Sequence, residues 1–226
     1  MKIDKYEALR YLGYNNQHID GKMHDKIDKL IKEIEKNIDG KYTYKKFEIK
    51  VLSDFIEVPG TKIKLLGSSI YEHLKDCLGV VIMSATLGVP ADKIIKKKSI
   101  VSGEDGLLTD ALCSAYVEAV CETCNEEIDG KLTSEGLTST WRFSPGYGDL
   151  DLKVNSEILN ELNAFRTIGL YASESHMLTP SKSVVAIIGY YKGEPKTEKT
   201  RSSCGNKSCK SCMLKGSCPL YKEDKG

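Results

Sequence analysis

The chain has 226 residues, 40% of them hydrophobic, which is enough for one sizeable domain with a packed core. Its 33 basic and 32 acidic residues leave a formal net charge of +1, so the overall charge gives no reason to expect nucleic acid or a membrane surface as a partner. The N-terminal residues MKIDKYEALRYLGY lack an apolar signal core, and no run approaches the roughly 20 apolar residues that cross a bilayer, so we expect a cytoplasmic protein.

The N-terminal part of the chain predicts an amphipathic helix followed by strands. Residues 18–38 place isoleucine and leucine at spacings of three and four, and Asp39 and Gly40 end this stripe. Residues 42–66 change to short apolar alternations with a turn signal at Pro59 and Gly60. This second pattern is typical of strands joined in a hairpin.

The middle of the chain predicts a buried strand between helices. Residues 70–77 favour a short helix, and the continuous apolar run at residues 78–83 has the length of a buried strand. A short lysine-rich helix is expected over residues 91–98. Residues 105–128 predict the longest helix, with a narrow face of small residues suited to close packing against a sheet.

The last elements complete an α+β pattern. We expect a helix over residues 156–165 with Ser156 as its N-cap, and a central strand over residues 183–191. Strands and helices do not alternate strictly, which favours a single α+β domain with a mixed or antiparallel twisted sheet flanked by helices. This domain would span residues 1–193, and a cysteine-rich tail would span residues 194–226.

One loop between these elements combines residues suited to binding a ligand. The segment 141–149, WRFSPGYGD, is stiff at Pro145 and open at Gly146, where no Cβ blocks the approach of a ligand to the backbone. Arg142 can hold a carboxylate with two parallel hydrogen bonds, and Tyr147 offers a flat face to an adenine ring or a sulfonium cation. From the residues alone, a rigid surface turn whose arginine pairs with a nearby aspartate is equally open.

The same loop resembles a known family. The string RFSPGY at residues 142–147 is similar to the R-x-x-x-G-Y signature of the activation domain of cobalamin-dependent methionine synthase. Residues 170–189, LYASESHMLTPSKSVVAIIG, resemble a second segment of that family, in which an E-S, a methionine and a proline precede an S-V that enters a strand. Residues 7–14 and 70–88 resemble free-standing activation proteins of this kind, so the resemblance covers most of residues 1–195.

The resemblance implies a binding site for S-adenosylmethionine. Matched position by position, Arg142, Gly146 and Tyr147 take ligand-binding roles, while Ser144 and Pro145 shape the loop. The resemblance also implies a site role for Glu174, which matches a glutamate of the family. That residue either orients the pocket or pairs with Arg166 or Lys182.

The resemblance further implies a reactivation subunit. In that chemistry, inert cob(II)alamin receives one electron and the methyl group of S-adenosylmethionine, so we expect the cobalamin on a separate methionine synthase or another corrinoid protein. A flavodoxin or a ferredoxin-like protein would supply the electron. The cofactor performs the chemistry, and no catalytic acid or base is expected from this chain. Two other functions stay open: an iron-sulfur electron donor or activator for another corrinoid protein, and a module that senses S-adenosylmethionine without methyl transfer.

The tail predicts a metal site that the family does not explain. Its cysteines follow the pattern C-x4-C-x2-C-x5-C, which places four thiolates within reach of one metal centre. They are Cys204, Cys209, Cys212 and Cys218. An iron-sulfur cluster, a structural zinc ion and a metal-free tail are all open, because spacing alone does not separate them. The four other cysteines are expected to be core or helix residues.

Overall fold

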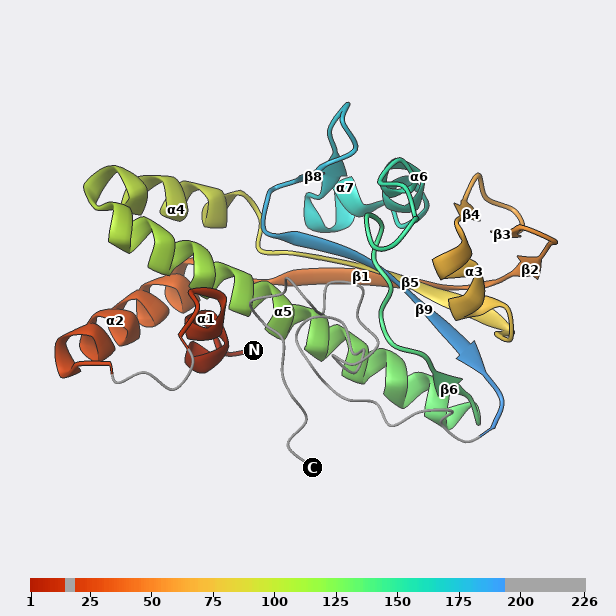
Figure 1. Cartoon of the computed structure of the whole chain (residues 1–226), viewed down its shortest axis with the longest axis horizontal. Coiled ribbons are helices and arrows are strands. Elements are labelled where there is room, and N and C mark those ends of the chain that lie inside the picture. The colour runs from red at the N-terminus through yellow and green to blue at the C-terminus, as the bar shows by residue number, and fades with distance from the viewer. Residues whose placement is uncertain (15–18, 194–226) are drawn as a thin grey trace.

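The structure, a computed structural model, describes residues 1–14 and 19–193. At its centre lies a four-stranded antiparallel sheet with the strand order β1, β5, β9, β6 (Figure 1). The bounds of these strands are β1 (Lys41–Glu48), β5 (Gly79–Thr86), β6 (Thr138–Ser139) and β9 (Ser183–Tyr191). Helices pack on both faces of the sheet, which confirms the expected α+β architecture.

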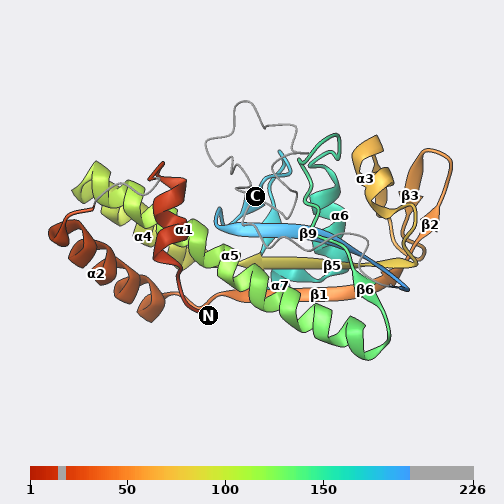
Figure 2. The ribbon, with the colours of Figure 1, turned by 60° about the horizontal axis from the view of Figure 1, so that its bottom comes forward.

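Two groups of helices lie on opposite faces of the sheet (Figures 1 and 2). The first group consists of α1 (Lys5–Tyr11), α2 (Gly21–Asn37), α4 (Val89–Val101) and α5 (Gly103–Ser134). The second consists of α3 (Ser68–Leu74), α6 (Val154–Glu161) and α7 (Ala164–Ile168). Each group shares a hydrophobic core with one face of the sheet.

The central strand β5 contributes side chains to both cores. Val81 and Met83 pack with α5, whereas Val80 and Ile82 pack on the opposite face with α3 and α6. Successive side chains of a strand point to opposite faces, so a strand covered on both sides is apolar throughout. This burial explains the continuous apolar run in the sequence. Leu78, expected in the strand, instead precedes it and is 52% exposed.

The longest helix, α5, confirms the expected helix and extends it at both ends. Its N-terminus is capped by Ser102, whose hydroxyl accepts a hydrogen bond from the backbone N–H of Asp105 at 3.3 Å. Ala111 and Ala115 are buried in the core between α5 and the sheet, as the small-residue face predicts. The helix therefore lies close along the sheet, and its polar side chains border the loop that follows β6.

Short strands make up the remaining sheet structure. β2 (Lys50–Val51), β3 (Phe55–Glu57) and β4 (Lys64–Leu66) form a three-stranded antiparallel sheet, in which β3 and β4 flank the predicted turn. A two-stranded hairpin is formed by β7 (Tyr171–Ala172) and β8 (Leu178–Thr179). This second hairpin, like α1, is not recognised from the sequence pattern.

The helix expected over residues 156–165 is two helices. α6 already begins at Val154, so Ser156 lies inside the helix rather than at its N-cap. Asn163 then adopts a left-handed conformation with φ of 50° and separates α6 from α7. An asparagine tolerates this conformation better than most residues, and the change of direction leaves Phe165 68% exposed instead of in the core.

The tail lies outside the described residues. Its four cysteines and the domain boundary at residue 193 therefore stay predictions. In the part of the chain that the structure describes, no helix is long and apolar enough to span a membrane.

Candidate ligand-binding site

Residues 141–149, named here the Arg142 loop, connect β6 to the segment that enters α6. Phe143 fixes the start of the loop to the central sheet: its backbone N–H donates to the carbonyl oxygen of Ile187 at 2.9 Å, and the N–H of Ile187 donates back at 2.8 Å. The Phe143 side chain is 1% exposed and belongs to the core with α3 and α6. The loop is therefore anchored directly beside β9.

The tip of the Arg142 loop is a tight turn. The N–H of Tyr147 donates to the carbonyl oxygen of Ser144 at 3.1 Å, with Pro145 and Gly146 between them. Gly146 has a φ of 86°, and proline followed by glycine at positive φ is the residue pattern of a type II turn. The ring of Tyr147 is 40% exposed and meets Phe143 edge to face at 6.2 Å. The turn thus lies directly beside an exposed aromatic ring.

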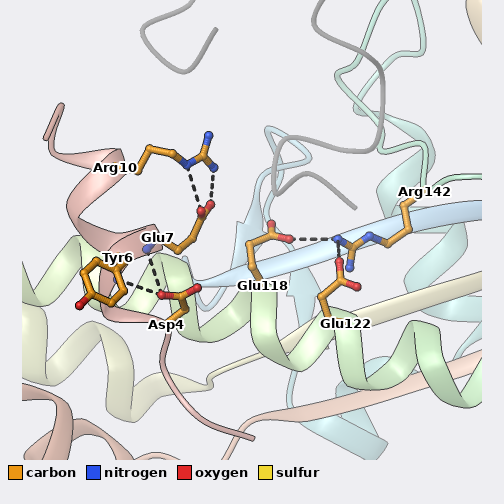
Figure 3. Close-up of polar contacts among 7 residues, drawn as sticks. All are labelled: Asp4, Tyr6, Glu7, Arg10, Glu118, Glu122 and Arg142. Carbon is orange, nitrogen blue, oxygen red and sulfur yellow. Dashed lines mark hydrogen bonds and ion pairs between the residues drawn. The ribbon is translucent and has the colours of Figure 1, made fainter. Parts of the chain in front are cut away.

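Arg142 faces α5, away from the core that holds its neighbour Phe143. Its Nη2 donates hydrogen bonds to Glu118 at 3.1 Å and to Glu122 at 2.9 Å (Figure 3). The two glutamates are four residues apart and so lie on the same side of the helix. The Arg142 side chain is only 11% exposed. Its Nη1 is buried without a hydrogen-bond partner among the described residues.

This cluster is acidic overall, because two carboxylates surround one guanidinium. Burial raises the pKa of Glu118 above its ordinary value; Arg142 opposes the rise, and Glu122 adds to it. The positive charge of Arg142 thus only partly compensates the cost of burying Glu118. A cation placed beside the cluster would be stabilised by the remaining negative charge.

Helix α1 borders the same cluster from the other side. Glu7 accepts a hydrogen bond from Nε of Arg10 at 2.9 Å, and both side chains of this ion pair are largely buried (Figure 3). Burial raises the pKa of Tyr11, and the charges of Glu7 and Glu118 raise it further. Glu7 also raises the pKa of Glu118. The carboxylates of α1 and α5 are therefore close enough to influence one another.

Glu174 lies apart from these contacts, in the turn between β7 and β8. It is exposed and has no hydrogen bond or ion pair with another described residue. An ion pair with Lys182 is not present among the described residues, where that lysine contacts Asp110 at 2.9 Å and the hydroxyl of Ser114 at 2.9 Å. No pairing with Arg166 is present among the described residues either. A role of Glu174 toward a ligand stays a prediction.

Glu118 and Glu122 are not recognisable from the sequence as partners of Arg142. Their only local signal is an acidic pair four residues apart on a helix whose nearby positions are small or apolar. That signal is weak, because exposed helix faces commonly carry glutamate. The pairing depends on the packing of a loop against a helix some twenty residues earlier in the chain.

The described residues contain no group of three or more histidine, cysteine, aspartate or glutamate side chains that could hold a metal ion. Cys113, Cys121 and Cys124 are buried free thiols in α5, as expected for core cysteines. Burial raises the pKa of Cys113 and of Cys124 to about 12, so both remain protonated at neutral pH.

Comparison with known proteins identifies the fold. No protein-family model matches the chain, and no curated protein matches it. Among solved structures, a crystal structure of the MetH reactivation domain bound to AdoHcy matches with a TM-score of 0.59 at 14% sequence identity. The match covers 78% of this chain and 66% of that chain, just under two thirds of its length. At this level of identity the likeness is one of fold alone, and the fold of this chain resembles that of the MetH reactivation domain.

Proposed function

We propose that this chain binds S-adenosylmethionine, and its demethylated product S-adenosylhomocysteine, at the Arg142 loop. The observation that carries the proposal is the position of Arg142 between Glu118 and Glu122, beside the turn of Pro145 and Gly146. The fold resembles that of a domain solved with AdoHcy, which supports a ligand of this chemical class.

The features of the loop correspond to the parts of this ligand. The exposed ring of Tyr147 is suited to stacking on adenine or to contacting a sulfonium. The tight turn beside this ring depends on Gly146, because its φ of 86° strains any side chain and a Cβ there would lie 3.0 Å from Leu152. Glu118 and Glu122 favour the positively charged sulfonium over the neutral thioether of S-adenosylhomocysteine.

Arg142 would serve the site in two ways. It donates both glutamate hydrogen bonds from Nη2 and buries Nη1, so Nε is the donor left for the carboxylate of a ligand. It also holds Glu118 and Glu122 in place and offsets part of their charge. A guanidinium is suited to this arrangement because its five N–H donors have a fixed planar geometry.

The binding site would serve a separate cobalamin-dependent methionine synthase or another corrinoid protein. In this role the chain orients the methyl group of S-adenosylmethionine and excludes water. Cobalamin on the partner would accept the methyl group, with one electron from a flavodoxin or a ferredoxin-like protein. The chain's contribution is binding and orientation, which requires no catalytic acid or base.

Isothermal titration calorimetry of the full chain with S-adenosylmethionine and S-adenosylhomocysteine tests the binding proposal. We expect saturable binding of both, and a higher melting temperature in the presence of either ligand. The absence of binding heat together with an unchanged melting temperature would refute the proposal.

The reactivation role needs its own experiment. The full chain is mixed with reduced flavodoxin, S-adenosylmethionine and a cobalamin-dependent methionine synthase that lacks its own reactivation domain. Formation of methylcobalamin, followed in the absorption spectrum, would support reactivation. Ligand binding without methylcobalamin would instead favour a module that only senses S-adenosylmethionine.

A further inference from the structure

The short helix α3 contacts both ends of the Arg142 loop. At the far end, both carboxylate oxygens of Asp149 meet the N-terminus of this helix. The backbone N–H of Ser68 donates to Asp149 at 2.6 Å, its hydroxyl at 2.8 Å, and the backbone N–H of Ser69 at 2.9 Å. The N-cap residue of α3 is Gly67, which has no side chain for this purpose. A residue 80 positions along the chain therefore caps the helix.

At its other end, α3 holds the start of the loop. Nε2 of His73 lies 3.1 Å from the carbonyl oxygen of Trp141 and 3.0 Å from the hydroxyl of Thr140. Since a carbonyl oxygen only accepts, a hydrogen bond between these two atoms requires the proton on Nε2 of His73. The His73 ring also lies 4.1 Å from the Trp141 ring and 5.4 Å from the Phe143 ring. One turn and a half of helix thus connects the first and last residues of the loop.

The middle of the contact is close-packed. A Cβ added at Gly148 would lie 2.7 Å from the hydroxyl oxygen of Ser69 and 2.9 Å from its Cβ. Such a contact is too short to be accommodated without movement. The loop therefore lies directly on α3, with no room for a side chain between them. Hydrogen bonds, above all the one from the Ser68 hydroxyl, hold the pKa of Asp149 far below its usual range. Its carboxylate therefore remains charged.

We propose that Asp149 and His73 are positioning residues, through which α3 holds the Arg142 loop in the conformation that binds the ligand. This inference rests on the proposed binding of S-adenosylmethionine. A loop ordered before binding does not lose its conformational freedom at the moment of binding, so the ligand binds more tightly. Neither residue needs to touch the ligand in order to act in this way.

The loop has independent anchors, so losing the contact with α3 loosens it without unfolding the chain. Phe143 remains paired with Ile187 of β9, and Leu150 remains buried at 3% exposure. Between these two anchors, Asp149→Ala leaves residues 144–149 without their hydrogen bonds to the N-terminus of α3. The expected change is therefore local, and it affects the turn of Pro145 and Gly146.

The sequence provides a direct probe of this change, because Trp141 is the single tryptophan of the chain. We expect Asp149→Ala to shift its fluorescence emission to longer wavelength, to speed hydrogen exchange at the amides of residues 144–149, and to weaken S-adenosylhomocysteine binding about tenfold. Asp149→Asn keeps one acceptor oxygen and should recover part of the affinity. The matched control is Asp151→Ala, whose carboxylate, among the described residues, contacts only Lys153 in its own turn.

Wild-type affinity, emission and exchange in Asp149→Ala would overturn the positioning role. If that variant fails to fold, Ser68→Ala removes one of the three hydrogen bonds and is judged by the same three measurements. If the wild-type chain binds neither S-adenosyl ligand, the proposed function fails, whereas emission and exchange still decide whether α3 orders the loop. The two failures are thus distinguishable.

Discussion

Arg142 lies between two glutamates that are four residues apart on α5, and only 11% of its side chain is exposed. Its removal would leave two carboxylates facing each other at the edge of a core, with Glu7 nearby. The same residue is the proposed donor to a ligand carboxylate. A substitution of Arg142 is therefore expected to change both the stability of the chain and its affinity for the ligand.

Arg142→Ala should weaken S-adenosylmethionine binding by about 1.5 to 3 kcal/mol, the range for a hydrogen bond to a charged group. It should also lower the stability of the chain by roughly 3 kcal/mol, because a buried charge loses its partner. Calorimetry measures the first effect and urea denaturation the second. Unchanged affinity in the folded variant would exclude Arg142 from the ligand site.

Glu118 gives a pH-dependent prediction. Its folded-state pKa is raised, so the folded chain holds its proton to a higher pH than the unfolded chain does. Stability then falls as the pH rises from the unfolded to the folded pKa. Glu118→Gln abolishes this titration. We therefore expect the variant to have a higher melting temperature at neutral pH, and its stability to change less with pH between the unfolded and folded pKa of Glu118. A lower melting temperature at neutral pH would mean that the ion pair with Arg142 outweighs the burial of Glu118.

The same variant should lose ligand selectivity. Without the Glu118 charge, preference for the sulfonium of S-adenosylmethionine over the thioether of S-adenosylhomocysteine should fall by about 1 kcal/mol, or roughly fivefold. This is the value of one contact between unit charges near 4 Å even at the dielectric constant of water. Paired titrations with the two ligands measure the ratio. An unchanged ratio would show that Glu118 does not face the sulfur.

At the scale of elements, periodicity and apolar runs predict the long helix α5 and the strands β5 and β9, because burial leaves a direct pattern in the sequence. The helix expected over residues 156–165 fails at Asn163, where a left-handed residue interrupts an otherwise helical pattern. Short strands such as β7 and β8 have two residues each, too few for periodicity to detect.

The candidate site, too, is predictable from the sequence only in part. The Arg142 loop is recognisable from its own residues, since proline and glycine impose local geometry. The partners of Arg142 on α5 and the cap that Asp149 provides to α3 join residues far apart in sequence. Such pairings follow from tertiary packing, which a single sequence does not specify.

The turn of the Arg142 loop can be tested with a matched pair of substitutions. Gly146 has a φ of 86°, and a Cβ there would lie 3.0 Å from the Leu152 side chain. Gly60 has a φ of 80°, and a Cβ there would meet nothing within 4 Å. Both valine variants should lose about 1 to 3 kcal/mol from backbone strain. Only Gly146→Val should abolish S-adenosylmethionine binding in calorimetry; equal binding by both variants would reduce the loop to a structural turn.

At the scale of the whole molecule, the described residues contain two hydrophobic cores, one on each face of the sheet. The sequence of residues 194–226 adds few apolar side chains besides its cysteines, chiefly Met213, Leu214, Leu220 and Tyr221. Such a composition cannot form a core of its own. We therefore expect truncation after residue 193 to change the melting temperature little.

The cysteine pattern of the tail predicts a metal in the full chain purified without oxygen. The expected ligands are Cys204, Cys209, Cys212 and Cys218. An iron-sulfur cluster would make the protein brown, and this colour would fade in air. Zinc would leave the protein colourless, with about one metal ion per chain. Metal analysis of the intact chain decides between them, and a metal-free anaerobic preparation would refute the site.

Replacing Cys209 and Cys212 together with serine separates the tail from the ligand site. Two thiolates cannot hold a four-ligand centre, so this variant should release the metal. The Arg142 loop is anchored by β9, α3 and α5, all within the described residues, so S-adenosylmethionine binding should remain intact. If binding disappears together with the metal, the tail contributes to the ligand site. If the variant binds normally but no longer supports methylcobalamin formation with reduced flavodoxin, the metal belongs to the electron-transfer step.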